Sequence, residues 1–218
     1  MRIRRRIWWI AGLALLAAAT AAYALRHEWQ GDPEADVARL LEVLDLKSGS
    51  ALGEVGAGSG RMTVVAARLL GPSGRVFSTE IEAKKVAEIE QAAAKGGLQN
   101  VTAILGGEKE TKLPKDCCDG VFLRRVYHHF TDAAPLNASL YEALRPGGRL
   151  AVIDFAPKRL YFWLPRPSGV SPDRDGHGMP PGLLLEELAR AGFVLDRQVN
   201  DWSAGDYCVV VRKPAAAN

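Results

Sequence analysis

Short apolar runs and amphipathic segments alternate along residues 50–212, separated by turns rich in glycine and proline. The apolar runs predict strands at residues 50–55, 75–79, 101–105, 120–126, 149–155, 193–199 and 207–212. Helices are expected at residues 33–46, 61–70, 83–95, 133–144 and 181–191. Because strands and helices follow one another in regular order, the pattern predicts an α/β fold with a doubly wound, mostly parallel, seven-stranded sheet.

The final two predicted strands are joined only by the short segment 201–206, so we expect an antiparallel C-terminal hairpin. The least regular stretch is 155–180, which contains several prolines and the aromatic residues Tyr161, Phe162 and Trp163. It follows the fifth predicted strand, where a lid over the substrate would lie.

The N-terminal 26 residues have a different composition from the rest. Residues 1–6 carry four arginines, and residues 7–25 carry no charge, which is just long enough to span a bilayer as a helix. Trp8 and Trp9 suit a membrane interface and favour an anchor, whereas Ala22-Tyr23-Ala24 fits the cleavage site of a signal peptide. The positive-inside rule would place residues 27–218 outside the cytoplasm, in the periplasm of a bacterial cell.

Charge and cysteine content exclude several classes. The formal net charge is +3, but Arg2, Arg4, Arg5 and Arg6 contribute +4, which leaves −1 for all other residues. Such a body offers no electrostatic reason to bind nucleic acid. Neither Cys117-Cys118 nor Cys208 has the spacing of a zinc site, so we expect no metal and interpret these cysteines as strand residues without disulfides.

A glycine-rich turn follows the first predicted strand. Its glycines, Gly56, Gly58 and Gly60, permit backbone conformations that let a nucleotide-like ligand approach closely. A dinucleotide fingerprint would need a further glycine where Arg61 stands, and no phosphate-binding G-K-S/T sequence follows. Glu80 ends the second predicted strand, at the offset where a carboxylate accepts hydrogen bonds from a ribose diol.

Four successive motifs carry a resemblance: EVGAGSG at 54–60, GRVFSTEI at 74–81, VYHHF at 126–130 and LRPGGRLAVIDF at 144–155. Together they resemble the motifs of class I S-adenosylmethionine-dependent methyltransferases, over nearly the whole body. The resemblance implies a Rossmann-like methyltransferase fold for residues 27–218, S-adenosyl-L-methionine as cofactor, and a small-molecule methyl acceptor. A non-catalytic cofactor- or partner-binding module on the same fold is the alternative.

The resemblance also implies a set of cofactor-binding residues. The methionine part of the cofactor would lie on the first turn, formed by Glu54, Gly56, Ala57, Gly58, Ser59 and Gly60. Within it, Glu54 could either orient the turn or meet a ligand ammonium. Glu80 would hold the ribose hydroxyls, with Ile81 beside it. The commonest form of the family has an aspartate near the adenine amine, at the position where this chain has Gly107. Glu108 or Glu110 would take the place of that aspartate.

The catalytic candidates are Tyr127, His128 and His129, which directly follow the fourth predicted strand. They would face the crevice at the carboxyl end of the sheet, where a histidine can deprotonate an incoming nucleophile. The alternative is that they only shape the pocket, since methyl transfer can proceed mainly by positioning. Arg125 stands where related sequences often have a small or acidic residue.

Overall fold

The computed structural model describes residues 32–157, 178–203 and 205–215, and residues 33–218 form one compact unit. The predicted anchor or signal segment, residues 1–26, lies outside the described residues, as do most of the predicted lid and its aromatic residues. None of the helices in the described part of the chain combines the length and apolar character that a membrane span requires.

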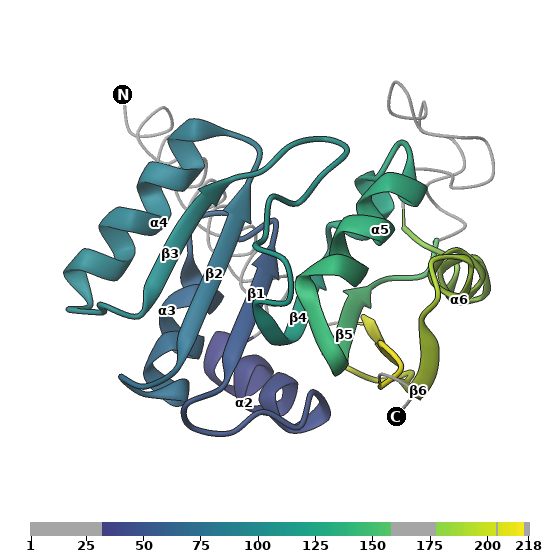
Figure 1. Cartoon of the computed structure of the whole chain (residues 1–218), viewed down its shortest axis with the longest axis horizontal. Coiled ribbons are helices and arrows are strands. Elements are labelled where there is room, and N and C mark those ends of the chain that lie inside the picture. The colour runs from purple at the N-terminus through teal and green to yellow at the C-terminus, as the bar shows by residue number, and fades with distance from the viewer. Residues whose placement is uncertain (1–31, 158–177, 204, 216–218) are drawn as a thin grey trace, which may run out of the picture. The chain divides into compact units, whose positions relative to one another are not determined.

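Strands and helices alternate along the described chain much as the pattern predicts (Figure 1). In order they are α2 (Pro33–Val43), β1 (Ala51–Val55), α3 (Arg61–Leu70), β2 (Arg75–Glu80), α4 (Ala83–Lys95), β3 (Val101–Leu105), β4 (Cys118–Arg124), the 3-10 turn η1 (Tyr127–His129), α5 (Ala133–Ala143), β5 (Leu144–Asp154), α6 (Pro181–Arg190), β6 (Val194–Val199) and β7 (Tyr207–Arg212).

The seven strands form one sheet in the order β3-β2-β1-β4-β5-β7-β6. The first five are parallel to one another, and β7 pairs antiparallel with both β5 and β6. This confirms the doubly wound, mostly parallel sheet with an antiparallel C-terminal hairpin. The last strand of the chain therefore lies inside the sheet, between β5 and β6, rather than at its edge.

Two hydrophobic cores lie on the two faces of the sheet. In β7, Val209 and Val211 pack with α5 and α6, whereas Cys208 and Val210 pack with α2 and α3. Successive strand residues point to opposite faces, so a strand covered by helices on both sides must be apolar throughout. This is why β7 reads Tyr-Cys-Val-Val-Val, with every one of these residues buried.

Several strand boundaries differ from the sequence prediction, and two of these differences have a clear physical cause. β4 ends at Arg124, because Arg125 adopts a left-handed conformation (φ 54°) and its N–H bonds to the Ile153 carbonyl at 2.7 Å. β5 begins at Leu144, so the segment 145–148, predicted as a turn, belongs to it. There the backbone pairs with the chain after β7, through the bonds Gly147 N–H to Lys213 O (3.0 Å) and Lys213 N–H to Gly148 O (2.9 Å).

The cysteine prediction is wrong for one pair. Cys117 and Cys118, adjacent at the start of β4, are joined by a disulfide, whereas Cys208 is a free, buried thiol in β7. Burial raises the pKa of the Cys208 thiol to about 12, so it stays protonated at neutral pH.

Candidate cofactor and catalytic site

The glycine turn connects β1 to α3 at the carboxyl end of the sheet. Gly56, Gly58 and Gly60 have φ angles of 74°, 59° and 79°, in the left-handed region that side-chain residues avoid. The N–H groups of Gly56 and Ala57 bond to the Thr79 carbonyl at 2.9 and 3.1 Å, which lays the turn across the end of β2. The pattern of three glycines is thus required by backbone geometry.

Glu80 closes this turn from the neighbouring strand. Its Oε1 accepts a 2.7 Å hydrogen bond from the Gly58 N–H, and its Oε2 accepts one of 3.1 Å from the Ile81 N–H. The side chain is half-buried, and each carboxylate oxygen retains acceptor capacity for a ligand. The structure therefore brings together the turn and the acid that the sequence predicted as partners.

Two exposed apolar side chains flank Glu80. Ile81 is 60% exposed, and Leu105, the register partner of Glu80 on β3, is 53% exposed. Leu105 was not identified from the sequence, because an apolar residue ending a strand gives no signal of exposure. Together the two offer an apolar surface beside a carboxylate, which suits a flat, uncharged ring next to a diol.

Glu54 lies inside the protein rather than at the ligand surface. Only 3% of it is exposed, and its carboxyl accepts hydrogen bonds from the hydroxyls of Thr63 (2.5 Å) and Ser78 (3.3 Å). These bonds link β1 to α3 and β2, so Glu54 orients the turn. Of the two roles open to Glu54, orienting the turn or meeting a ligand ammonium, these contacts support the first. Burial raises the pKa of Glu54 to about 7, against the effect of both hydroxyls.

The remaining predicted cofactor residues occupy different positions. Ser59 is exposed at the turn, and Ala57 is buried beneath it. Glu108 is exposed in the loop after β3, where Gly107 bonds to the Glu110 carbonyl at 2.8 Å. Glu108 thus lies at the carboxyl edge of the sheet, but no hydrogen bond or ion pair among the described residues joins it to the turn or to Glu80.

Tyr127, predicted to face the crevice, has its side chain inside the protein in this structure. Its side chain is fully buried and its hydroxyl donates a 2.9 Å hydrogen bond to Oε2 of Glu187 on α6. The Asn137 side chain on α5 donates to the same hydroxyl at 2.8 Å. Tyr127 therefore ties η1 to the helices on one face of the sheet.

His128 and His129 remain at the carboxyl edge, next to each other, with ring centroids 4.0 Å apart. His128 is buried and bonds to Asp154, whose carboxylate is fully buried at the end of β5. His129 is exposed. Its pKa is lowered from the ordinary value, mainly by partial desolvation and to a smaller extent by the neighbouring His128. The imidazole of His129 is consequently neutral at neutral pH.

A buried ion-pair network lies beside η1 and includes Arg124 and Arg125. Arg125 makes bonds of 2.8 to 3.0 Å to both carboxylate oxygens of Asp206, which precedes β7. Arg124 lies 3.0 Å from Asp36 on α2 and 3.9 Å from Asp206. Burial raises the pKa of the Asp206 carboxyl, and the hydrogen bonds from Arg125 oppose that rise. No local pattern reveals partners so far apart in sequence.

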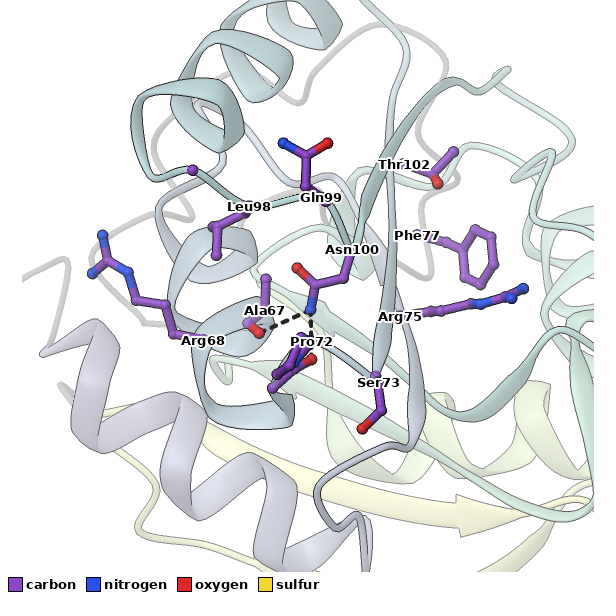
Figure 2. Close-up of a pocket in the computed structure, with 13 residues that line it drawn as sticks. Ala67, Arg68, Pro72, Ser73, Arg75, Phe77, Leu98, Gln99, Asn100 and Thr102 are labelled. Atoms are coloured by element: carbon purple, nitrogen blue, oxygen red, sulfur yellow. Dashed lines mark hydrogen bonds between the residues drawn. The ribbon is translucent and has the colours of Figure 1, made fainter.

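A separate cavity of about 830 Å³ lies at the opposite edge of the sheet (Figure 2). It is formed by the loops α3–β2 and α4–β3, where the Asn100 side chain bonds to the carbonyls of Ala67 and Gly71, both at 2.9 Å. It contains none of the predicted site residues, so it is not the crevice that the glycine turn forms.

Comparison with known proteins defines the class. Residues 46–172 match the family model described as a methyltransferase domain, which is more than half of the chain. Together with the fold and the turn–carboxylate pair, this match shows that the chain belongs to the class I S-adenosylmethionine-dependent methyltransferases.

Among curated relatives, the chain is 29% identical over 113 residues to a ubiquinone/menaquinone biosynthesis C-methyltransferase from Marinomonas sp. (strain MWYL1), covering 51% of this chain and 45% of that protein. It is 27% identical over 184 residues to nocamycin O-methyltransferase from Saccharothrix syringae, covering 75% and 66%. A protein-L-isoaspartate O-methyltransferase from Methanothrix thermoacetophila is 34% identical, with 53% and 52% covered. The chain thus spans about half to two thirds of the length of these relatives.

Solved structures share the fold. A methyltransferase from Aquifex aeolicus superposes with a TM-score of 0.67 at 22% identity, covering 81% of this chain and 89% of that one. The [4+2]-cyclase SpnF superposes with a TM-score of 0.70 at 17% identity, covering 88% and 85%. At these identities the likeness shows the fold alone.

The described residues fit the family's cofactor, S-adenosyl-L-methionine. A methyl group added at Gly58 would meet nothing within 4 Å, so the turn is open on the side where the glycine lacks a side chain. The Glu80 carboxylate lies at that glycine, with Ile81 and Leu105 exposed beside it. An open glycine backbone, a diol acceptor and an apolar surface are the features that a nucleoside with a charged tail requires.

Proposed function

We propose that the protein transfers a methyl group from S-adenosylmethionine to a small-molecule acceptor. The observation that carries the proposal is the hydrogen bond from the Gly58 N–H to Glu80. This bond joins the glycine turn and the carboxylate into a single binding site. Family membership supports the same function. When bound, the cofactor supplies an electrophilic methyl group on a sulfonium.

The chain would hold the cofactor along the carboxyl edge of the sheet. The glycine turn would take its methionine part, Glu80 its ribose hydroxyls, and Ile81 with Leu105 the adenine ring. The protein's contribution to rate would be alignment of the acceptor and exclusion of water from the reacting atoms. His128 and His129 of η1 would contribute on the acceptor side.

A small-molecule acceptor is favoured by the charge of the body and by the relatives. The residues outside the N-terminal arginines sum to a net charge of −1, which gives no electrostatic reason to expect nucleic acid as a partner. Two of the relatives are named for ubiquinone/menaquinone biosynthesis and for nocamycin, although a third is named for protein L-isoaspartate.

Calorimetric titration of the full chain tests cofactor binding. We expect S-adenosylmethionine and its demethylated product to bind at micromolar to sub-millimolar concentration, and NAD, as a dinucleotide control, not to bind. Absence of heat with both sulfur nucleosides at millimolar concentration would overturn the proposal.

The second candidate is a binding module without methyl transfer. It is favoured by one observation: a fold neighbour is named a [4+2]-cyclase, so this architecture does not by itself establish methyl transfer. The two candidates separate in an assay with methyl-labelled cofactor and a panel of phenols, enols and amines. Labelled product supports the enzyme, whereas tight binding without label transfer to any acceptor supports the module.

The N-terminal residues extend the proposal to location. We propose that residues 7–25 anchor the protein in a membrane, or are removed as a signal, with the arginines of residues 1–6 on the cytoplasmic side. Alkaline phosphatase fused after residue 30 and after residue 213 should be active at both positions. Activity of a cytoplasmic reporter at both positions would instead place the body in the compartment where the cofactor is made.

A further inference from the structure

Asp154 holds the imidazole of His128 at two points. Its Oδ1 lies 2.8 Å from Nδ1 of His128, and its Oδ2 lies 3.1 Å from both Nδ1 and the backbone N of His128. The Phe155 N–H donates to Oδ1 at 2.9 Å, which fixes the carboxylate in turn. Ring and backbone of His128 are therefore bound to one fully buried acid.

This arrangement decides which ring nitrogen carries the proton. An ionised carboxylate can only accept hydrogen bonds, so Nδ1 of His128 must be the donor. In the neutral imidazole, Nε2 then carries the lone pair. Nε2 receives no hydrogen bond from the described residues. It is also not one of their fully buried polar atoms that lack a hydrogen-bond partner. It is thus available to accept a proton.

The 3-10 turn η1, which carries His128, begins directly after a residue that packs on the glycine turn. Val126, two positions before His128, packs so closely on Gly56 that a side-chain carbon there would come within 2.4 Å of it. The rings of Phe155 and His129 lie 4.9 and 4.0 Å from that of His128, measured between centroids. His128 is accordingly held at the edge where the cofactor's methyl group is expected.

We propose that His128 is the general base of the reaction and that Asp154 is its positioning residue. The proposal rests on the proposed function and adds a substrate class. A base is needed only where the acceptor loses a proton on methylation, as a hydroxyl, a phenol, an enol or an acidic C–H group does. A carboxylate acceptor, already ionised at neutral pH, needs none.

The step balances without a further reactant. The acceptor atom bonds to the methyl carbon, the carbon–sulfur bond breaks with its electron pair passing to sulfur, and the acceptor proton passes to Nε2 of His128. The resulting imidazolium lies against the carboxylate of Asp154, which stabilises the charge and does not take the proton.

Other charged and titratable groups surround the pair. His129 stacks on the same turn, the Arg125 guanidinium lies 5.9 Å from the Phe155 ring, and Asp206 and Tyr207 lie close enough to Asp154 to interact with it electrostatically. Any titration of His128 must therefore be assigned by comparison with variants of its neighbour His129.

Nitrogen-15 NMR of the histidine rings tests the proposal in the full-length wild type. We expect His128 to show a protonated Nδ1 and an unprotonated Nε2 at neutral pH, with its signals identified by their loss in His128→Gln and their retention in His129→Gln. The tautomer with the proton on Nε2 would overturn the proposal, and this result needs no variant of Asp154 to fold.

Asp154→Asn provides the second measurement, because an amide can present a donor to Nδ1 and reverse the tautomer. We expect the Nδ1 proton of His128 to be lost, with Asp132→Asn, an exposed acid on the loop after η1, leaving it unchanged. An unchanged His128 spectrum in folded Asp154→Asn would contradict the positioning role.

Two further experiments, with the cofactor product and with an isoaspartyl peptide, distinguish failure of the proposed function from failure of the proposed acceptor class. Titration with S-adenosylhomocysteine should shift the His128 ring signals; no binding would defeat the proposed function while leaving the tautomer result intact. The wild type should not methylate an isoaspartyl peptide. Transfer to that peptide at a rate that His128→Gln leaves unchanged would overturn the acceptor class.

Discussion

The backbone N–H of Gly58 donates a 2.7 Å hydrogen bond to Oε1 of Glu80, across 22 positions of sequence. The bond joins the turn after β1 to the end of β2, so both groups that would hold a nucleoside are already in place without it. Preorganisation of this kind lowers the cost of ordering the site when a ligand binds.

Replacing Glu80 by glutamine should weaken cofactor binding without unfolding the protein. A neutral amide keeps the shape but removes the charged acceptor, and hydrogen bonds to charged groups contribute about 1.5–3 kcal/mol. We expect the dissociation constant for S-adenosylhomocysteine to rise roughly tenfold to one-hundredfold, measured by calorimetry. Glu82→Gln, an exposed acid two positions along, is the matched control; equal affinity in both variants would refute the role of Glu80.

Alanine at Gly56 and at Gly58 should have different effects on stability. Both positions have positive φ, so each substitution should cost about 1–2 kcal/mol in backbone strain. At Gly56 the new carbon would also lie 2.4 Å from Val126, whereas at Gly58 it meets nothing within 4 Å. We expect Gly56→Ala to lower the free energy of unfolding by roughly 1–3 kcal/mol more than Gly58→Ala in urea titrations. Equal losses in the free energy of unfolding would show that the Val126 side chain moves aside at little cost.

Glu54 should make the protein less stable as the pH rises from about 4.5 to about 7. Its folded-state pKa is raised, so its stabilising contribution is complete below the unfolded-state pKa and is lost as the pH approaches the folded-state value. The loss is on the order of 3 kcal/mol across this window. Urea titrations of wild type and Glu54→Gln should show this slope only in the wild type; parallel pH profiles would contradict the assignment.

Asp206→Asn should destabilise the fold far more than loss of a surface ion pair. Its carboxylate has no exposed surface and takes three hydrogen bonds from Arg125, so the amide leaves that cation poorly compensated. We expect a loss of roughly 3 kcal/mol in the free energy of unfolding. Glu186→Gln, which breaks the exposed pair with Arg190 on α6, should change it little. Similar values for the two variants would mean that solvent reaches Asp206.

Local features of the sequence predicted most elements of the body. The bounds of α3, α4, β3 and β7 agree residue for residue with the structure, because apolar spacing and glycine or proline turns act over a few positions. The glycine turn and its relation to Glu80 were predicted for the same reason: parallel strands joined by one helix bring their carboxyl ends together.

Long-range packing decided what those patterns left open. Tyr127 was expected at the crevice, but its buried hydroxyl donates a hydrogen bond to Glu187, which lies 60 positions away in the sequence. Glu54 could have oriented the turn or met a ligand, and its hydrogen bonds from hydroxyls on two other elements support the first role. A polar residue at a strand end carries the same local signal whether it faces a ligand or a buried partner.

The sequence by itself determined the order of strands and helices, the class of fold and the position of the cofactor turn, because these follow from neighbouring residues. Only the tertiary structure placed β7 between β5 and β6, set Asp206 against Arg125, and brought Asp154 of β5 to the ring of His128. These pairings join residues 26 and 81 positions apart, and each depends on a buried charge finding its partner once the sheet has formed.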